Sequence, residues 1–149
     1  DDYFSTNWIE RAWLYLKEYG DQAILHPEFV VSFGAQASYC WQVDQAGQYY
    51  VQDGLLVNNY WTSWTFAKRS VYLQCPYSIT RPLQTGFGYE DWHWNCEVIA
   101  SGFEHRIAWG SVGFYRRKIV SRVTTDTAVG AIIAPTKLFA RNAPGKVTV

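Results

Sequence analysis

The pattern of apolar and polar positions changes near Pro27 and divides the chain into one helix and a long β-rich region. Over residues 7–19, apolar side chains recur every three or four positions, which is the period of an amphipathic helix. Gly20 follows, at a place where a helix often ends in a residue with positive φ. The sequence therefore predicts a helix over residues 7–19. Its predicted buried face consists of Ile9, Ala12, Trp13 and Leu16.

From Pro27 onward, short runs rich in aromatic and β-branched residues alternate with Gly, Asp and Asn, which is typical of strands joined by turns. The apolar runs on both sides of Asp53-Gly54 predict a hairpin with a type I′ turn. Gly110 and Gly113 predict a bulge or bend inside the longest run. About seven to nine strands with no helix between them predict antiparallel pairing. We expect a mainly β fold, α+β at the margin, in which the N-terminal helix packs on an antiparallel β-sandwich or barrel-like sheet.

The length of 149 residues is that of one domain. We expect residues 1–134 to form a single globular domain and residues 135–149, which contain Pro135 and Pro144, to form a C-terminal tail or arm. Hydrophobic residues make up 48% of the chain and charged residues 17%, a composition that argues against disorder. No apolar run approaches the roughly 18 residues needed to span a bilayer.

The stretch "GYEDWHWNCEV", residues 88–98, gathers aromatic, acidic and thiol side chains. On a strand, Trp92, Trp94 and Cys96 would point to the core, while His93 would face water. Because His93 and Cys96 would lie on opposite faces, this pattern favours a structural strand over a metal or catalytic site. We expect no metal, no cofactor and no catalytic residue.

The three cysteines follow neither a zinc spacing nor a C-x-x-C motif. In an exported protein one pair can form a disulfide, and we expect Cys75–Cys96 because the loop-like residues between them would bring the two together. The alternative is three buried thiols in a reducing compartment. The chain contains no Met and begins at Asp1, so we expect a processed mature chain that is secreted, extracellular or periplasmic. The redox state of Cys40 stays open.

The motif "LQCP" followed by "YEDWHWNC" resembles a dermatopontin repeat, in which a Cys-Pro precedes a D-R-x-W-x-F-x-C segment and the two cysteines pair. The resemblance covers residues 73–96 and lacks the Asp-Arg pair. It implies a disulfide between Cys75 and Cys96.

The net charge is zero but unevenly spread. Residues 1–75 carry eight acids and four bases, whereas residues 76–149 carry five acids and nine bases. This asymmetry is compatible with head-to-tail self-association. A basic patch can bind phosphate or sulfate groups, or serve as a solvated strand face or subunit contact, while a pI near 7.0 argues against nucleic acid. The patch consists of Arg116, Arg117, Lys118 and Arg122.

The stretch "NNYWTSWTF" places aromatic rings beside amide and hydroxyl groups. A sugar-binding surface uses flat rings for the apolar face of a pyranose and polar groups for its hydroxyls. A subunit interface uses the same residue types, and ordinary packing is the third alternative. The candidate residues are Asn58, Asn59, Tyr60, Trp61 and Trp64.

Three functions are compatible with these observations. The first is a non-enzymatic, extracytoplasmic structural subunit that self-associates through aromatic-rich and charge-complementary surfaces. The alternative is a carbohydrate-binding extracellular module, lectin-like or dermatopontin-like. A weaker alternative is a small secreted hydrolase built from the histidines and carboxylates of residues 88–105.

Overall fold

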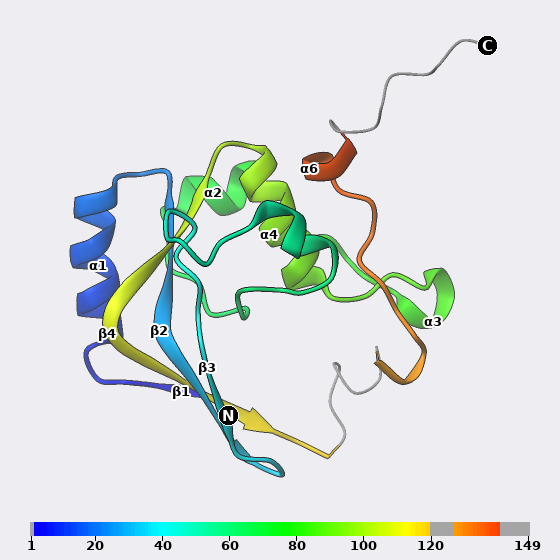
Figure 1. Cartoon of the computed structure of the whole chain (residues 1–149), viewed down its shortest axis with the longest axis horizontal. Coiled ribbons are helices and arrows are strands. Elements are labelled where there is room, and N and C mark those ends of the chain that lie inside the picture. Colours follow the sequence, from blue (N-terminus) through cyan, green and yellow to red (C-terminus); the bar gives the residue numbers. More distant parts are fainter. Residues whose placement is uncertain (1, 120–126, 141–149) are drawn as a thin grey trace.

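The computed structural model describes residues 2–119 and 127–140, and within them the centre of the fold is one four-stranded mixed sheet (Figure 1). The strand order is β1-β4-β2-β3. The two long central strands, β2 and β4, are parallel, and the short edge strands β1 and β3 are antiparallel to their neighbours. The strands are β1 (Tyr3–Phe4), β2 (Ala23–Gly34), β3 (Ser38–Trp41) and β4 (Glu104–Arg117).

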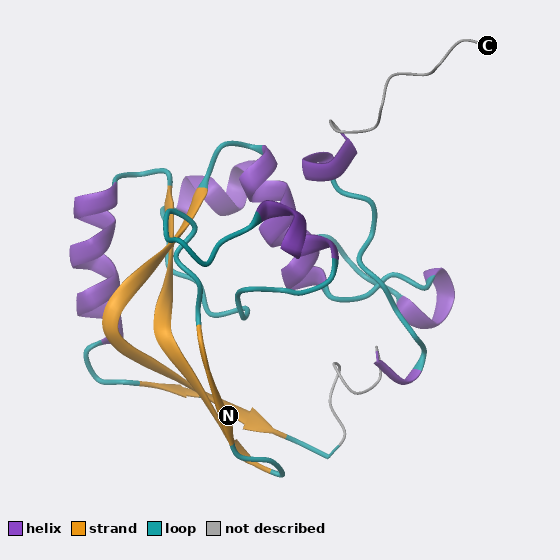
Figure 2. Ribbon diagram, in the orientation of Figure 1, coloured by secondary structure: helices purple, strands orange, loops and turns teal. Residues whose placement is uncertain are grey.

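The prediction of an antiparallel sandwich or barrel of seven to nine strands is wrong. Several runs that were expected to be strands are helices: η1 (Gln52–Leu56), which replaces the predicted hairpin, α2 (Arg69–Gln74) and α4 (Glu90–Ala100). Figure 2 shows that most of the remaining chain between β3 and α2 is loop. Because helices lie between β2 and β4 in the chain, the crossover that a parallel pair needs is available.

The predicted N-terminal helix is confirmed as α1 (Trp8–Tyr19), which ends at Gly20 with φ 91°. Its buried face begins one residue earlier than expected and consists of Trp8, Ala12 and Leu16. Ile9 and Trp13 are 51% and 47% exposed, so their predicted burial is wrong. The spacing of four residues keeps the buried side chains on one stripe, and this stripe faces the sheet.

A bulge in β4 confirms one of the two glycine predictions. Pro27 pairs with Ala108 and Phe29 with Val112, so three β4 residues lie opposite one residue of β2. Gly110, at the centre, has φ 77°, and its N–H donates to the Glu28 carboxylate at 2.8 Å. Only a residue without a side chain adopts this φ at little cost.

Helices cover both faces of the sheet (Figure 1). On one face α1 packs on Ala23, Leu25 and Ala108. On the other face Ile24 packs with residues of α2 and α4. The alternation of neighbouring β2 residues between the two clusters explains why this strand is apolar without a break. The second cluster is built from Ile24, Val71, Cys75, Trp94, Val98 and Phe103.

The predicted disulfide is wrong, because Cys75 and Cys96 are both free thiols. Cys75 directly follows α2, Cys96 lies on α4, and the two belong to different core clusters. The Cys75 thiol donates to the Ser101 hydroxyl at 3.4 Å. Cys40, on β3, is exposed and also free.

Two further short helices are α3 (Pro82–Thr85) and α6 (Lys137–Ala140). Within the predicted tail, α6 packs against α4: the Lys137 N–H donates to Glu97 Oε1 at 2.7 Å, and Lys137 Nζ lies 3.1 Å from Glu97 Oε2. Residues 141–149, the rest of the predicted tail, lie outside the described residues. Within the described part, no helix has the length and apolar character needed to cross a bilayer.

Candidate functional site

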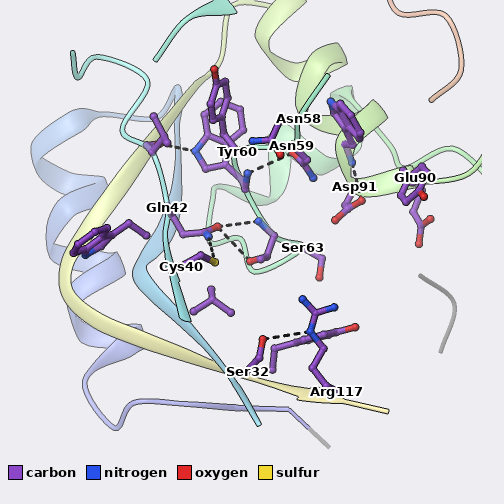
Figure 3. A pocket seen from close by; sticks show the side chains of 18 of the residues that line it. Ser32, Cys40, Gln42, Asn58, Asn59, Tyr60, Ser63, Glu90, Asp91 and Arg117 are labelled. Carbon is purple, nitrogen blue, oxygen red and sulfur yellow. Dashed lines mark hydrogen bonds between the residues drawn. The ribbon is translucent and has the colours of Figure 1, made fainter. Parts of the chain in front are cut away.

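A cavity of about 830 Å³ lies between the second half of the sheet, the loop of residues 58–63 and the first turn of α4 (Figure 3). The core cluster built around Ile24 covers the first half of β2 on this face. After the bulge, β2 and β4 present Val30, Ser32, Tyr115 and Arg117 to the cavity instead. The helices α2 and α4 therefore cover only part of this face of the sheet. The part that they leave uncovered is the floor of the cavity.

The register of β2 and β4 positions the polar floor. Ser32 pairs with Tyr115, and Gly34 with Arg117, so alternation brings these side chains to one face. Arg117 Nε donates to the Ser32 hydroxyl at 3.4 Å, and the guanidinium carbon lies 5.2 Å from the centre of the Tyr115 ring. The floor thus carries one positive charge beside two hydroxyl groups.

Gln42 connects the β3 side of the cavity to the loop of residues 58–63. Its side-chain oxygen accepts from the Thr62 N–H at 2.8 Å and from the Thr62 hydroxyl at 3.4 Å. Its side-chain nitrogen donates to Cys40 Sγ at 3.7 Å. Since Gln42 is buried and bonded at both ends of its amide, it holds this wall in place.

The opposite wall is the start of α4. Tyr89 precedes the helix in the left-handed region, with φ 52° and ψ 57°, a conformation that costs free energy for a residue with a bulky side chain. Its hydroxyl lies 3.2 Å from that of Thr127. Glu90 and Asp91 add two carboxylates at the helix N-terminus, where the helix dipole favours negative charge. Strained residues of this kind are concentrated at binding sites.

The structure brings four of the five predicted glycan-contact residues to the cavity: Asn58, Asn59, Tyr60 and Trp61. Trp64 does not line it and instead packs edge-on against Phe4, with ring centres 5.8 Å apart. The Asn59 side-chain oxygen accepts from Asn95 Nδ2 at 2.9 Å, which fixes the orientation of this amide.

Trp61 is a core residue, only 1% exposed. Its ring stacks on His105 with centres 3.9 Å apart, and its indole N–H donates to the Val43 carbonyl at 2.6 Å. One face of the indole is therefore already occupied by an imidazole. The predicted role of Trp61 as a sugar platform is not compatible with this burial.

Sequence reasoning missed Tyr77, which lines the cavity with its ring stacked on Trp94. The ring centres are 4.7 Å apart and the planes differ by 5°. Burial raises the pKa of the Tyr77 hydroxyl, so this group is a neutral donor. The residue follows Pro76 in a loop, and nothing in the local pattern distinguishes it from other loop tyrosines.

None of the three histidines lines the cavity. His26 and His105 are fully buried, with His26 Nε2 only 2.7 Å from His105 Nδ1. Burial lowers the pKa of both rings, that of His105 to about 3, and the neighbouring His105 lowers the pKa of His26 further. The cavity lining therefore contains no histidine that could act as the base of the hydrolase considered above.

The three described residues of the predicted basic patch, Arg116, Arg117 and Lys118, do not all line the cavity. Arg117 lines the cavity, whereas Arg116 does not, and its backbone N–H donates to the Asp2 carboxylate at 2.8 Å. Lys118 is exposed and has interaction partners of its own. Arg122 lies outside the described residues.

The described residues contain no group of three or more His, Cys, Asp or Glu side chains placed to hold a metal ion. Comparison with known protein families, with curated proteins and with solved structures found no match.

Proposed function

We propose that this chain is a non-enzymatic binding module that holds a carbohydrate in the cavity. The observation that carries the proposal is the cavity itself: about 830 Å³, with tyrosine rings and side-chain amides in one lining. Small-molecule sites have volumes of about 300–1,000 Å³ and combine apolar walls with a few polar groups. The apolar face of a pyranose can stack on an aromatic ring, and its hydroxyls can form hydrogen bonds with side-chain amides and carboxylates.

Tyr77 is the proposed stacking platform. Because its ring is stacked on Trp94, it loses little rotamer freedom when a ligand binds. Asn58, Asn59 and Asp91 offer donors and acceptors around it. The hydrogen bonds of Gln42 to Thr62 and of Asn59 to Asn95 hold the site in shape without ligand, which lowers the entropic cost of binding.

The test is isothermal titration with a panel of neutral and acidic monosaccharides and short glycans. Tyr77→Ala should weaken the binding of any sugar found by about tenfold or more, because the stacking surface is lost. Tyr39→Ala is the matched control, since Tyr39 is exposed on β3 and does not line the cavity. The proposal fails if no sugar binds, or if Tyr77→Ala binds as tightly as the unmodified chain while remaining folded by circular dichroism.

The second candidate function, a self-associating structural subunit, is favoured by the edge strand β3. Tyr39 and Trp41 on this strand are 70% and 65% exposed. An exposed edge with large apolar side chains is a template for pairing with another chain. Light scattering should then give a mass above 17.2 kDa that falls to the monomer value in Tyr39→Ser/Trp41→Ser. Ile79→Ser, at another exposed apolar position, is the control. A monomer at every concentration would exclude this candidate.

A further inference from the structure

Among the described residues, Arg117 is the only basic residue that lines the cavity. Its Nε is bonded to Ser32, which orients the side chain. Figure 3 shows the guanidinium pointing into the cavity, toward the side of Ser63. The two terminal nitrogens form a fork, and this fork matches the two oxygens of a carboxylate or the oxygens of a sulfate.

The carboxylates of the cavity do not neutralise this charge directly. Among residues 2–119 and 127–140, the ion pairs join other residues, and none of them involves Arg117. Glu90 and Asp91 lie on the α4 wall and have interaction partners. Arg117 is an exposed residue that makes no ion pair with a described carboxylate, so its guanidinium fork is accessible to an anionic ligand group.

We propose that the ligand is an acidic sugar, and that the Arg117 fork binds its carboxylate or sulfate group. The inference rests on the proposed function and adds the chemical class of the ligand. The Ser32 hydroxyl and the Tyr115 ring flank the fork. The neutral ring stacks on Tyr77.

Cys40 provides a reporter inside the same cavity. It pairs in register with Val30 and lines the cavity, and it is exposed, whereas Cys75 and Cys96 are buried. Burial raises the pKa of the Cys40 thiol, and the positive charge of Arg117 acts in the opposite direction. An acid group bound at Arg117 should therefore slow the reaction of Cys40 with a thiol reagent for two reasons. The ligand shields the thiol from the reagent, and its negative charge offsets the positive charge of Arg117 that favours the thiolate.

The experiment compares sugars that differ only at C6: glucose with glucuronate, and galactose with galacturonate. Titration of the unmodified chain should show uronate binding at least tenfold tighter than the neutral sugar, and added salt should reduce this difference. Arg117→Gln should remove the preference, so that uronate and neutral sugar bind within about twofold of each other. Arg117→Lys, which keeps the charge but loses the fork, should retain only part of the preference.

Arg116→Gln is the control, since it removes the same charge from the neighbouring position, which does not line the cavity. It should leave both affinities unchanged. Equal binding of uronate and neutral sugar, or a preference that survives in Arg117→Gln, overturns the inference and leaves the proposed function standing. Binding of no sugar overturns both. Protection of Cys40 by uronate but not by the neutral sugar supports the inference independently.

Discussion

The two buried histidines are an uncommon feature at the scale of single residues. His26 and His105 lie in contact within the core, and Trp61 stacks on His105. In this environment the charged form of either ring is expensive, because water is excluded and the other ring is close. Both rings are therefore neutral in the folded protein at pH 7.

This pair predicts a loss of stability in acid. The folded-state pKa of each ring lies below its unfolded value of 6.5, so below pH 6.5 the unfolded chain binds protons that the folded chain does not. Stability is fully present above pH 6.5 and falls as the pH decreases toward the folded values. His105 alone should lower the free energy of unfolding by about 2 kcal/mol between pH 7 and pH 5, and His26 should lower it further.

Urea unfolding at both pH values measures this loss. His105→Gln should reduce the loss by about half, because it removes one of the two titrating rings. Equal stability at pH 5 and pH 7, or an unchanged loss in His105→Gln, would contradict the prediction.

Tyr89 gives a second prediction at this scale. A residue with φ 52° is strained by its β-carbon, so here Gly should be tolerated better than Ala. Tyr89→Gly should be more stable than Tyr89→Ala by about 1 kcal/mol in urea unfolding. Both variants lose the same ring contacts, so each serves as the control for the other. A more stable Ala variant would mean that the left-handed conformation is not adopted.

At the scale of elements, the helical period predicted α1 well because twelve residues contain three turns of pattern. The same method failed for α4, where Trp92, Trp94 and Cys96 are spaced as on a strand. In the helix, Trp94 and Cys96 are buried in different clusters, while Trp92 is half-buried on the cavity wall. A short apolar run fits both periods, and its neighbours in space determine which period forms.

The exposed and buried stripes of α1 can be separated by a matched pair of substitutions. Leu16→Ala should lower the free energy of unfolding by about 2–5 kcal/mol, because it leaves a cavity against the sheet. Ile9→Ala, on the exposed side, should change it by less than about 1 kcal/mol. Chemical denaturation measures both values. Similar costs for the two would contradict the observed orientation of the helix.

At the scale of the whole molecule, the cavity is assembled from segments that are distant in the chain. The lining comes from β2, from the end of β3, from the loop of residues 58–63, from the loop that carries Tyr77, from α4 and from the end of β4 (Figure 3). α6 supports this arrangement from behind, since Leu138 packs in one cluster with Leu55, Trp61 and Cys96. The C-terminal part of the described chain is thereby connected to the wall of the candidate site.

Truncation tests this support. A chain that ends at Ala134 loses Leu138 and Phe139 from the cluster around Trp61, so its free energy of unfolding should fall by about 2–4 kcal/mol. Cys96, whose pKa burial raises to about 12, should become reactive toward thiol reagents. A chain that ends at Ala140 keeps α6 and is the control. Equal labelling of Cys96 in the two chains would show that α6 does not protect it.

The sequence by itself determined α1, the second half of β2, most of β4 and the bulge at Gly110. These features depend on local periodicity and on the conformational freedom of glycine, and both can be read from neighbouring residues. It also indicated residues 58–61 as part of a candidate site.

Only the tertiary structure decided which runs became helices, which strands are parallel, and that Cys75 and Cys96 stay apart. It also decided that Trp61 is core, and that Tyr77 and Arg117 lie in the same cavity. These outcomes depend on contacts between residues far apart in the chain, and local sequence patterns do not include such contacts.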